Sequence, residues 1–365
     1  MKCNKCDLPC TITLRKKDNY CDQCFLLGTN HKFRAAIGKN KILSKNDKVL
    51  LCTSGGPSST MLVDLVHHGI TLDVHKKLRV VPYLLHITVR HGDHYAEDIN
   101  GILKQCRKYG FDVYFIHISE YLNSTKKLPQ LNTTPSIDNN YCNTFQDILI
   151  KLPATSSIDF INKVKRTLFI EYAKLLSCKY VFTAENSSRL AISLLTNLAI
   201  GRGSQVQNDI GFIDTRHEDS KIVRPMRDIS QEELEYYIKI KRIKPNYSVT
   251  ANNNSLQTVI GTFVTKLQDD FQSTISTVCK TADKIGALDE AEVNKKCSIC
   301  ESSALTKPHK LTALEATNLS RSLSTGVTVI DKIPNKTLFP LIGESLCYSC
   351  SKIYADIAPT SLPNI

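Results

Sequence analysis

The sequence predicts an α/β protein in which helices cover both faces of a mostly parallel β-sheet. Short apolar runs typical of buried strands alternate with segments whose apolar residues recur at helical spacing. The chain has 365 residues, 42% of them hydrophobic, which is enough to bury a sizeable core. No run reaches the roughly 18 apolar residues of a membrane span, and no apolar signal region follows Met1. We therefore expect a cytoplasmic protein with no membrane partner.

The elements of this fold follow from local patterns. Runs rich in branched and aromatic residues predict strands at 48–53, 80–87, 111–118, 179–183 and 221–226. Apolar residues three and four positions apart predict helices from about residue 60 and over about 99–109, 164–176 and 189–200. A last helix opens at Ser230, which has capping-box spacing to Glu233. Stretches at about 123–157, 246–256 and 301–336 are poor in pattern and are expected to be loops or insertions.

Paired cysteines stand at both ends of the chain. Because the cytosol keeps thiols reduced, the 14 cysteines favour metal ligands or buried thiols over disulfides. A pair with two intervening residues places two thiolates on one turn, and two such pairs supply the four soft ligands that Zn²⁺ prefers. We expect two closed, structural zinc sites, one formed by Cys3, Cys6, Cys21 and Cys24, the other by Cys297, Cys300, Cys347 and Cys350.

Other uses of these cysteines stay open. Cys10 lies inside the N-terminal loop and is a spare or an alternative ligand. Thiols without a metal are the alternative at both ends. A redox pair is disfavoured, because neither pair follows a strand at the start of a helix. The remaining cysteines, Cys52, Cys106 and Cys178, fit core positions, while Cys142 falls in a predicted loop.

These patterns divide the chain into four parts. A zinc-ribbon-like module is expected over residues 1–35 and the α/β domain over 45–245. A linker and helical segment is expected over 246–296, and a second zinc module with a long inserted loop over 297–355.

The charge balance favours an anionic partner. Lys and Arg number 47 against 35 Asp and Glu, a net charge of +12, and nucleic acid is the usual partner of such a surplus. Phosphate contacts need only exposed cations. Solvated helix faces are the alternative, and Phe25 and Phe33 are stacking residues or, more simply, core residues. The RNA-binding candidates are Lys32, Arg34, Lys39, Lys41, Arg202, Lys241 and Arg242.

A glycine-rich turn follows the first strand of the α/β domain. Glycines let backbone N–H groups approach an anion, and the N-terminus of the next helix adds a favourable dipole. The candidate phosphate contacts are Ser54, Gly55, Gly56, Ser58 and Ser59. A tight turn without a ligand is the alternative, since the motif alone is weak.

In context this turn resembles the pyrophosphate loop of the PP-loop ATP pyrophosphatases, a HUP-type fold. Thr183-Ala184-Glu185-Asn186-Ser187-Ser188-Arg189 is similar to that superfamily's T-G-H-N-A-D-D segment. Leu198–Gly203 and Ile222–Met226 are similar to its glycine-arginine turn and to the I-R-P-L strand of tRNA thiolases. With cysteine pairs at both ends, the whole chain resembles the cytoplasmic tRNA 2-thiolation protein 2 family.

Departures from the active superfamily pattern indicate lost chemistry. Ser58 stands where active members carry Asp, and Ser188 and Arg189 stand where they carry two acids. Adenylation needs Mg²⁺, which prefers carboxylate oxygens. The catalytic cysteines of active thiolases are also missing: one position reads Thr155-Ser156-Ser157-Ile158, and no cysteine lies between Cys178 and Cys279. ATP binding through the loop is expected to be weak.

The resemblance implies a heterodimer with the catalytic tRNA 2-thiolation subunit. Such a complex moves sulfur, delivered by a ubiquitin-like carrier, to the 2-position of the wobble uridine (U34) of tRNAs. This chain would be its non-catalytic, tRNA-binding and stabilising subunit. The alternatives are a self-sufficient ATP-dependent tRNA sulfurtransferase, or a zinc-containing scaffold unrelated to tRNA.

Overall fold

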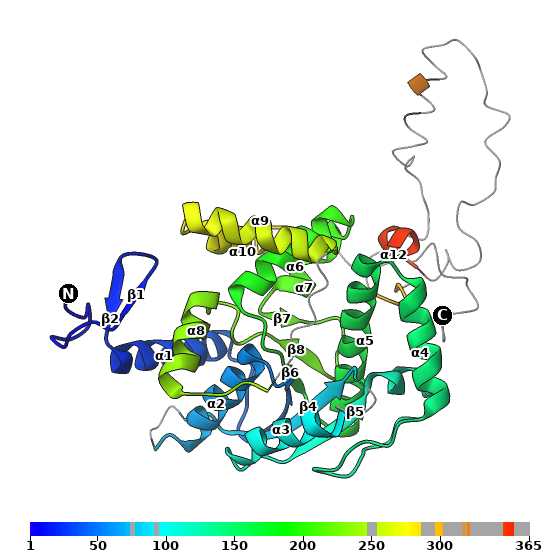
Figure 1. Ribbon diagram of the computed structural model, residues 1–365, viewed down its shortest axis with the longest axis horizontal. Coiled ribbons are helices and arrows are strands. Elements are labelled where there is room, and N and C mark those ends of the chain that lie inside the picture. Colours follow the sequence, from blue (N-terminus) through cyan, green and yellow to red (C-terminus); the bar gives the residue numbers. More distant parts are fainter. Residues whose placement is uncertain are drawn as a thin grey trace.

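The central sheet has six strands in the order β5-β4-β3-β6-β8-β7, all parallel except β7, which is antiparallel to β8. The computed structural model describes residues 1–73, 77–90, 95–246, 254–285, 296–301, 317, 320–321 and 346–353. Figure 1 shows the sheet inside the helices and a small hairpin, β1–β2, at the N-terminal end. The strands are β1 (Ile12–Leu14), β2 (Asp18–Tyr20), β3 (Asp47–Cys52), β4 (Val80–Thr88), β5 (Val113–His117), β6 (Tyr180–Phe182), β7 (Ile213–Asp214) and β8 (Lys221–Val223).

Helices cover both faces of the sheet, as the sequence predicts (Figure 1). No helix in the described part of the chain is long and apolar enough to cross a membrane. Two short 3₁₀ helices, η1 (Ile118–Leu122) and η2 (Gly203–Gln205), follow β5 and precede α7. The α-helices are α1 (Asp22–Asn40), α2 (Pro57–Thr71), α3 (Tyr95–Arg107), α4 (Asn139–Lys151), α5 (Ala154–Leu175), α6 (Ser187–Ala199), α7 (Val206–Ile210), α8 (Gln231–Lys241), α9 (Leu256–Asp270), α10 (Thr274–Ala282) and α12 (Tyr348–Ile353).

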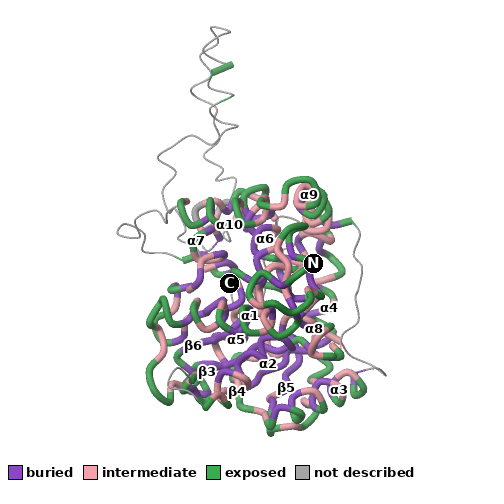
Figure 2. The backbone as a smooth tube through the Cα atoms, turned by 90° about the vertical axis from the view of Figure 1, so that its left-hand side faces the viewer, coloured by how far each residue is buried: buried purple, intermediate pink, exposed green. Residues whose placement is uncertain are grey.

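The two faces are built by alternation along β3. Val49 and Leu51 point into one hydrophobic cluster with α1, α2, α3 and α8, while Leu50 and Cys52 point into a second with α4 and α5. Successive strand side chains face opposite ways, so a strand buried on both faces must be apolar throughout. Helices α9 and α10 pack on α6 as an outer layer, and α9 is exposed along much of its length (Figure 2).

The strands and helices predicted from strong periodicity are present, most with small shifts at their ends, but the helix predicted over 164–176 begins earlier, at Ala154. α2 begins at Pro57, three residues before the apolar pattern, because Gly56 is its N-cap and proline is favourable in the first turn. The Ser230–Glu233 capping box is confirmed: each side chain bonds the other's backbone N–H.

The loop predicted over 123–157 is wrong in its second half, which holds α4 and the start of α5. Asp138 caps α4 by accepting the N–H groups of Asn140 and Tyr141. Cys142, Phe145 and Ile148 then form its buried face. Asparagines in the first turn hide this face from a composition-based reading.

The other two predicted loops are tested only in part. Of the stretch 246–256, residues 247–253 lie outside the described residues and α9 begins at Leu256. Most of 301–336 also lies outside them. At the N-terminus, α1 runs past residue 35 and packs on α2 and α8, so the first module continues into the domain. The predicted four-part division stays a prediction.

Candidate phosphate loop and cysteine sites

The glycine turn lies at the carboxyl end of β3, beside β6. Here the strand order changes direction, which is where open α/β sheets form a ligand crevice. Gly55 has φ +76°, a left-handed conformation that favours glycine. The N-terminus of α2 follows directly, as a phosphate-binding turn requires.

Hydroxyls of the loop itself hold its shape. The backbone N–H of Ser54 donates to Oγ of Ser59 at 3.1 Å, and that hydroxyl lies 3.1 Å from the Gly56 carbonyl, to which it donates. Ser59 is buried, whereas Ser54 is exposed and Ser58 is half-buried. Of the predicted phosphate contacts, Ser59 therefore serves the turn, and Ser54 and Ser58 are on the accessible side.

The chain that follows α8 is pinned to this loop. The N–H of Asn246 donates to the Gly55 carbonyl at 2.9 Å, and the Asn246 side chain donates to the Asp98 carbonyl at 3.0 Å. A Cβ at Gly55 would lie 2.3 Å from the Asn246 carbonyl oxygen. Glycine is therefore required here both for conformation and for close approach, and the sequence alone gave no signal for Asn246.

The positions that lack acids sit at two helix N-termini. Ser58 is in the first turn of α2, and Ser188 and Arg189 are in the first turn of α6. Glu185 lies just before α6, and its carboxylate is 3.9 Å from Nε of Arg224. Both helix N-termini carry positive dipole ends, and Arg189 adds a cation. This edge of the sheet therefore suits an anion better than Mg²⁺.

A buried histidine contacts the residue that precedes the loop. His86 on β4 is 7% exposed, and its Nδ1 lies 2.8 Å from the Thr53 carbonyl oxygen. Burial lowers the pKa of His86 to about 4, with a smaller contribution from Lys165, and outweighs the hydrogen bond to Thr53, which acts in the opposite direction. The imidazole is therefore neutral near pH 7.

The start of α5 holds other segments in place. Here the N–H of Leu256 donates to Oγ1 of Thr155 at 2.9 Å, and Oγ of Ser156 donates to the Ile353 carbonyl at 3.0 Å. Two hydroxyls thus anchor α9 and α12.

The N-terminal cysteines come together around the β1–β2 hairpin and α1. Cys21 caps α1, since its Sγ accepts the N–H of Cys24 at 3.4 Å. Sγ of Cys6 lies 3.7 Å from that of Cys21 and 3.6 Å from that of Cys24. With Cys3, the four sulfurs lie within 4.8 Å of one another, and Cys10 is not among them.

The C-terminal cysteines also converge, but inside the protein. Cys297, Cys300 and Cys350 are buried in the second hydrophobic cluster, and Cys347 packs against it. Sγ of Cys300 lies 3.6 Å from that of Cys347, and all four sulfurs lie within 4.8 Å of one another. The second pair lies at the start of α12, with Cys347 just before the helix and Cys350 on it, and α12 lies next to α5 (Figure 1).

Each quartet fits one tetrahedral metal ion of its own. Metal–sulfur bonds of about 2.3 Å place the sulfurs of such an ion about 3.8 Å apart, close to the separations found. The thiolates of an iron–sulfur cluster stand on different iron atoms and lie farther apart. Each quartet can therefore hold a single soft ion and leaves no open position.

A buried ion-pair network joins the C-terminal quartet to the domain. The Arg216 guanidinium bonds Asp209 and Asp214, the latter at 2.6 Å, and donates to the Cys300 carbonyl at 3.1 Å. Burial by itself raises the pKa of Asp214, but Arg216 and Arg166 outweigh it and lower that pKa to about 2. Arg166 also pairs with Glu301.

One predicted use of a basic residue is wrong. Arg202, predicted to contact RNA, is 2% exposed and bonds Asp159 through two nitrogens, so it is closed to a phosphate. Lys163 and Arg166 on α5 likewise form internal ion pairs, with Asp209 and Asp214 respectively. These basic side chains are largely buried because each pairs with an acid that is distant in the sequence.

The other RNA-binding candidates lie on α1 and around the end of α8, which pack side by side with α2 (Figure 1). Lys32 pairs with Glu233 at 2.7 Å, and Lys241 with Asp64 at 3.4 Å. Arg34 is half-buried. The exposed cations of the set are Lys39, Lys41 and Arg242.

The aromatic candidates for base stacking are core residues. Phe25 and Phe33 are 3% and 1% exposed within the first hydrophobic cluster. They are closed to RNA, as the simpler reading expects.

Three further thiols are core residues. Cys52, Cys106 and Cys178 are buried, and burial raises the pKa of both Cys106 and Cys178 to about 12. The loop position predicted for Cys142 is wrong, since it lies on α4 and is 5% exposed.

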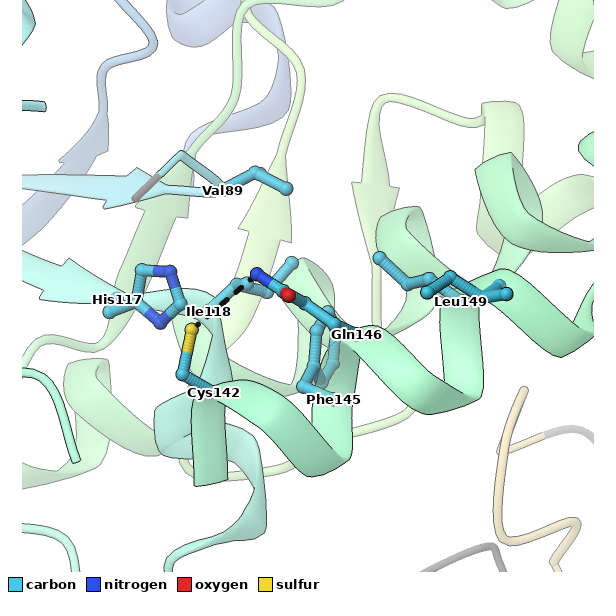
Figure 3. A pocket seen from close by; sticks show the side chains of 8 residues that line it. Val89, His117, Ile118, Cys142, Phe145, Gln146 and Leu149 are labelled. Carbon is cyan, nitrogen blue, oxygen red and sulfur yellow. Dashed lines mark hydrogen bonds between the residues drawn. The ribbon is translucent and has the colours of Figure 1, made fainter. Parts of the chain in front are cut away.

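Cys142 borders a pocket of about 300 Å³ between α4 and the ends of β4 and β5 (Figure 3). Gln146 donates to its sulfur at 3.7 Å, and burial raises the Cys142 pKa, so this thiol is not activated. The walls are mainly apolar: Val89, His117, Ile118, Phe145, Leu149 and Ile150 complete the lining.

Comparison with known proteins agrees with this architecture. The chain is 18% identical to the U34-tRNA thiolase NcsA from Methanococcus maripaludis, solved with its [4Fe-4S] cluster, with a TM-score of 0.63 over 87% of this chain and 98% of that one. At this identity the likeness establishes the fold alone: a mostly parallel α/β sheet of the PP-loop thiolase kind.

Sequence relatives carry the assignment further. The chain is 31% identical to a protein of Aedes aegypti over 90% of this chain and 80% of the relative, and 31% identical to one of Drosophila virilis over 99% and 92%. Both are named cytoplasmic tRNA 2-thiolation protein 2. Residues 255–352 also match the family described by that name. The chain therefore belongs to the cytoplasmic tRNA 2-thiolation protein 2 family.

Proposed function

We propose that this chain is the non-catalytic subunit of a cytoplasmic complex that thiolates the 2-position of U34 in tRNAs. It pairs with a catalytic thiolase as a heterodimer, binds tRNA and stabilises its partner. A ubiquitin-like carrier delivers sulfur to the complex without needing a site on this chain. Family membership and the thiolase-like fold support the reaction class.

One observation carries the non-catalytic role: the phosphate turn is kept while the acids beside it are absent. Gly55 retains its left-handed conformation, yet Ser58, Ser188 and Arg189 occupy the positions where the active superfamily has carboxylates. Mg²⁺ holds to carboxylate oxygens, and hydroxyls replace them poorly. The turn retains weak affinity for a phosphate through Ser54 and Gly56, and adenylation belongs to the partner.

Exposed cations support the tRNA-binding role. Lys39 and Lys41 at the end of α1 and Arg242 at the end of α8 are exposed on neighbouring helices, and the net charge is +12. Such residues bind phosphates without reading sequence, so binding should weaken steeply with salt. Arg34, Lys32 and Lys241 contribute at the margin of this surface because they are partly buried or paired.

Both cysteine quartets are proposed to hold structural zinc. Four thiolates at tetrahedral separations suit Zn²⁺, which would crosslink the segment before β1 to the start of α1, and residues 297–300 to the start of α12. Elemental analysis of protein purified without chelator should find about two zinc per chain. Iron in place of zinc, or neither metal, would contradict this.

The test compares this chain alone, its catalytic partner, and the two together. With ATP, tRNA and a sulfur donor, we expect the chain alone to form neither AMP and pyrophosphate nor 2-thiouridine, measured by mass spectrometry of digested tRNA. Thiolation by the chain alone would make it a self-sufficient sulfurtransferase and end the proposal. Depletion in cells should lower 2-thiouridine, and unchanged levels would remove the tRNA role.

A charge-reversal variant tests the surface. Lys39→Glu, Lys41→Glu and Arg242→Glu together should weaken tRNA binding in a filter or gel-shift assay and fail to restore 2-thiouridine in depleted cells. Lys280→Glu, an exposed lysine on α10, is the matched control and should behave as wild type. Equal effects of both changes would place the RNA elsewhere.

A further inference from the structure

Arg202 is the one predicted RNA contact that the structure places deep inside the protein, at the turn between α6 and η2. Its side chain is 1% exposed. The guanidinium donates to both carboxylate oxygens of Asp159 on α5, at 2.6 and 2.8 Å. Nη2, which makes the second of these bonds, also lies 3.2 Å from Sγ of Cys350. It thus contacts both a sulfur of the C-terminal quartet and a carboxylate.

We propose that Arg202 is a positioning residue of the C-terminal metal site. Its N–H donates to the Cys350 thiolate and, through Asp159, ties that thiolate to α5. This role rests on the metal proposed at the C-terminal quartet and does not depend on tRNA binding.

Charge explains why such a donor is needed. A divalent ion with four thiolates carries a net charge of about −2, which is costly to bury without polar partners. Cys350 is 0% exposed and Cys297 and Cys300 are 1% exposed, so water cannot serve these sulfurs. A charge-assisted N–H bond to sulfur replaces that solvation, and residues in this role orient the ligand.

The geometry calls for arginine in particular. The planar fork donates two parallel bonds to Asp159, while Nη2 also meets the sulfur. A lysine has one compact head and cannot hold the acid and the thiolate in this arrangement.

The turn that carries Arg202 also contacts α12 directly. Ser349 donates from Oγ to the Gly201 carbonyl at 2.7 Å, which docks α12 beside Arg202. Gly201 has φ +81°, and a Cβ there would lie 3.1 Å from that Oγ. The end of α6 and the second cysteine pair therefore fit together at two adjacent residues.

The N-terminal quartet provides an internal comparison. Its described sulfur donors are backbone groups: the N–H of Lys5 to Cys3 at 3.4 Å and that of Cys24 to Cys21 at 3.4 Å. Cys6 and Cys24 are partly exposed, so water reaches this site. A change at Arg202 should alter one metal site and leave the other as it was.

The experiment uses the full chain with Arg202→Met, Arg202→Lys and the control Arg227→Met. Arg227 pairs with Asp283 at 2.8 Å, and its backbone N–H donates to the Arg224 carbonyl. Neither partner belongs to a cysteine quartet. Transfer of zinc to a coloured chelator should be biphasic, and Arg202→Met should speed one phase about 10- to 100-fold with the other unchanged. Arg202→Lys should give an intermediate rate, and Arg227→Met the wild-type rates.

A spectroscopic readout separates this role from general destabilisation. In protein loaded with ¹¹³Cd, each quartet should give its own NMR resonance. Arg202→Lys, the milder change, should move one resonance and not the other, because the hydrogen bond alters electron density on a metal-bound sulfur. Unmoved resonances, or equal acceleration of both zinc phases, would overturn the proposal.

Discussion

Acidification should destabilise the protein through His86, and the effect can be isolated by one substitution. Burial is the main reason that the His86 pKa falls from 6.5 to about 4, with Lys165 adding to it and the Thr53 bond and Asp98 opposing it. An unfolded chain binds this proton near pH 6.5, whereas the folded chain resists it until about pH 4. Stability is therefore fully present above pH 6.5 and is lost as the pH falls toward 4.

The size of the loss follows from the two pKa values. Each pH unit within this window costs about 1.4 kcal/mol, so about 2 kcal/mol of unfolding free energy should disappear between pH 7 and pH 5. A typical domain has only about 5–15 kcal/mol, so the change is large enough to measure.

The assay is urea unfolding at pH 7 and pH 5, followed by circular dichroism, for wild type and His86→Asn. The asparagine amide can still donate to the Thr53 carbonyl but cannot take up a proton. The variant should lose about 2 kcal/mol less than wild type on going from pH 7 to pH 5, whatever its starting stability. Equal losses would show that His86 is not the group that titrates.

Three further outcomes follow from the structure. Gly55→Ala should lower the unfolding free energy by about 2 kcal/mol or more, since the left-handed φ and the Asn246 carbonyl both oppose a Cβ, while Gly28→Ala, in open space on α1, should be neutral or stabilising in the same urea series. Arg216→Met should cost about 3–5 kcal/mol in the same assay by leaving Asp209 and Asp214 buried without their cation; a cost under about 1 kcal/mol would mean that the network contributes little. Cys106, with its raised pKa of about 12, should react with iodoacetamide only as fast as the protein unfolds, whereas half-exposed Cys10 should react in the native state; mass spectrometry of the labelled peptides would reveal any early modification of Cys106.

The sequence predicts best where the cause is local. β3 is apolar over Val49–Cys52 because both faces are buried there, and this run can be recognised in the sequence itself. The cysteine quartets were also predictable, since each pair is made by a single turn. β7 has only two residues and pairs with β8, so no pattern within it could have revealed it.

What the sequence could not give depends on distant partners. Arg202 reads as a surface cation until Asp159, 43 residues away, and Cys350, 148 residues away, are seen beside it. Asn246 is likewise unremarkable in a polar stretch, and only the folded chain brings it onto Gly55. The burial of the C-terminal quartet follows from the packing of α5 and the sheet, which spacing does not encode.

The second hydrophobic cluster has a consequence for synthesis. Leu346 and Cys350 are among its members, although most of the cluster comes from strands and helices made before residue 182. While the chain grows on the ribosome, one side of the sheet must therefore wait, partly uncovered, for a segment translated much later. Uncovered apolar surface invites aggregation, so a nascent chain of this kind is a natural client for chaperones until residues 346–353 emerge.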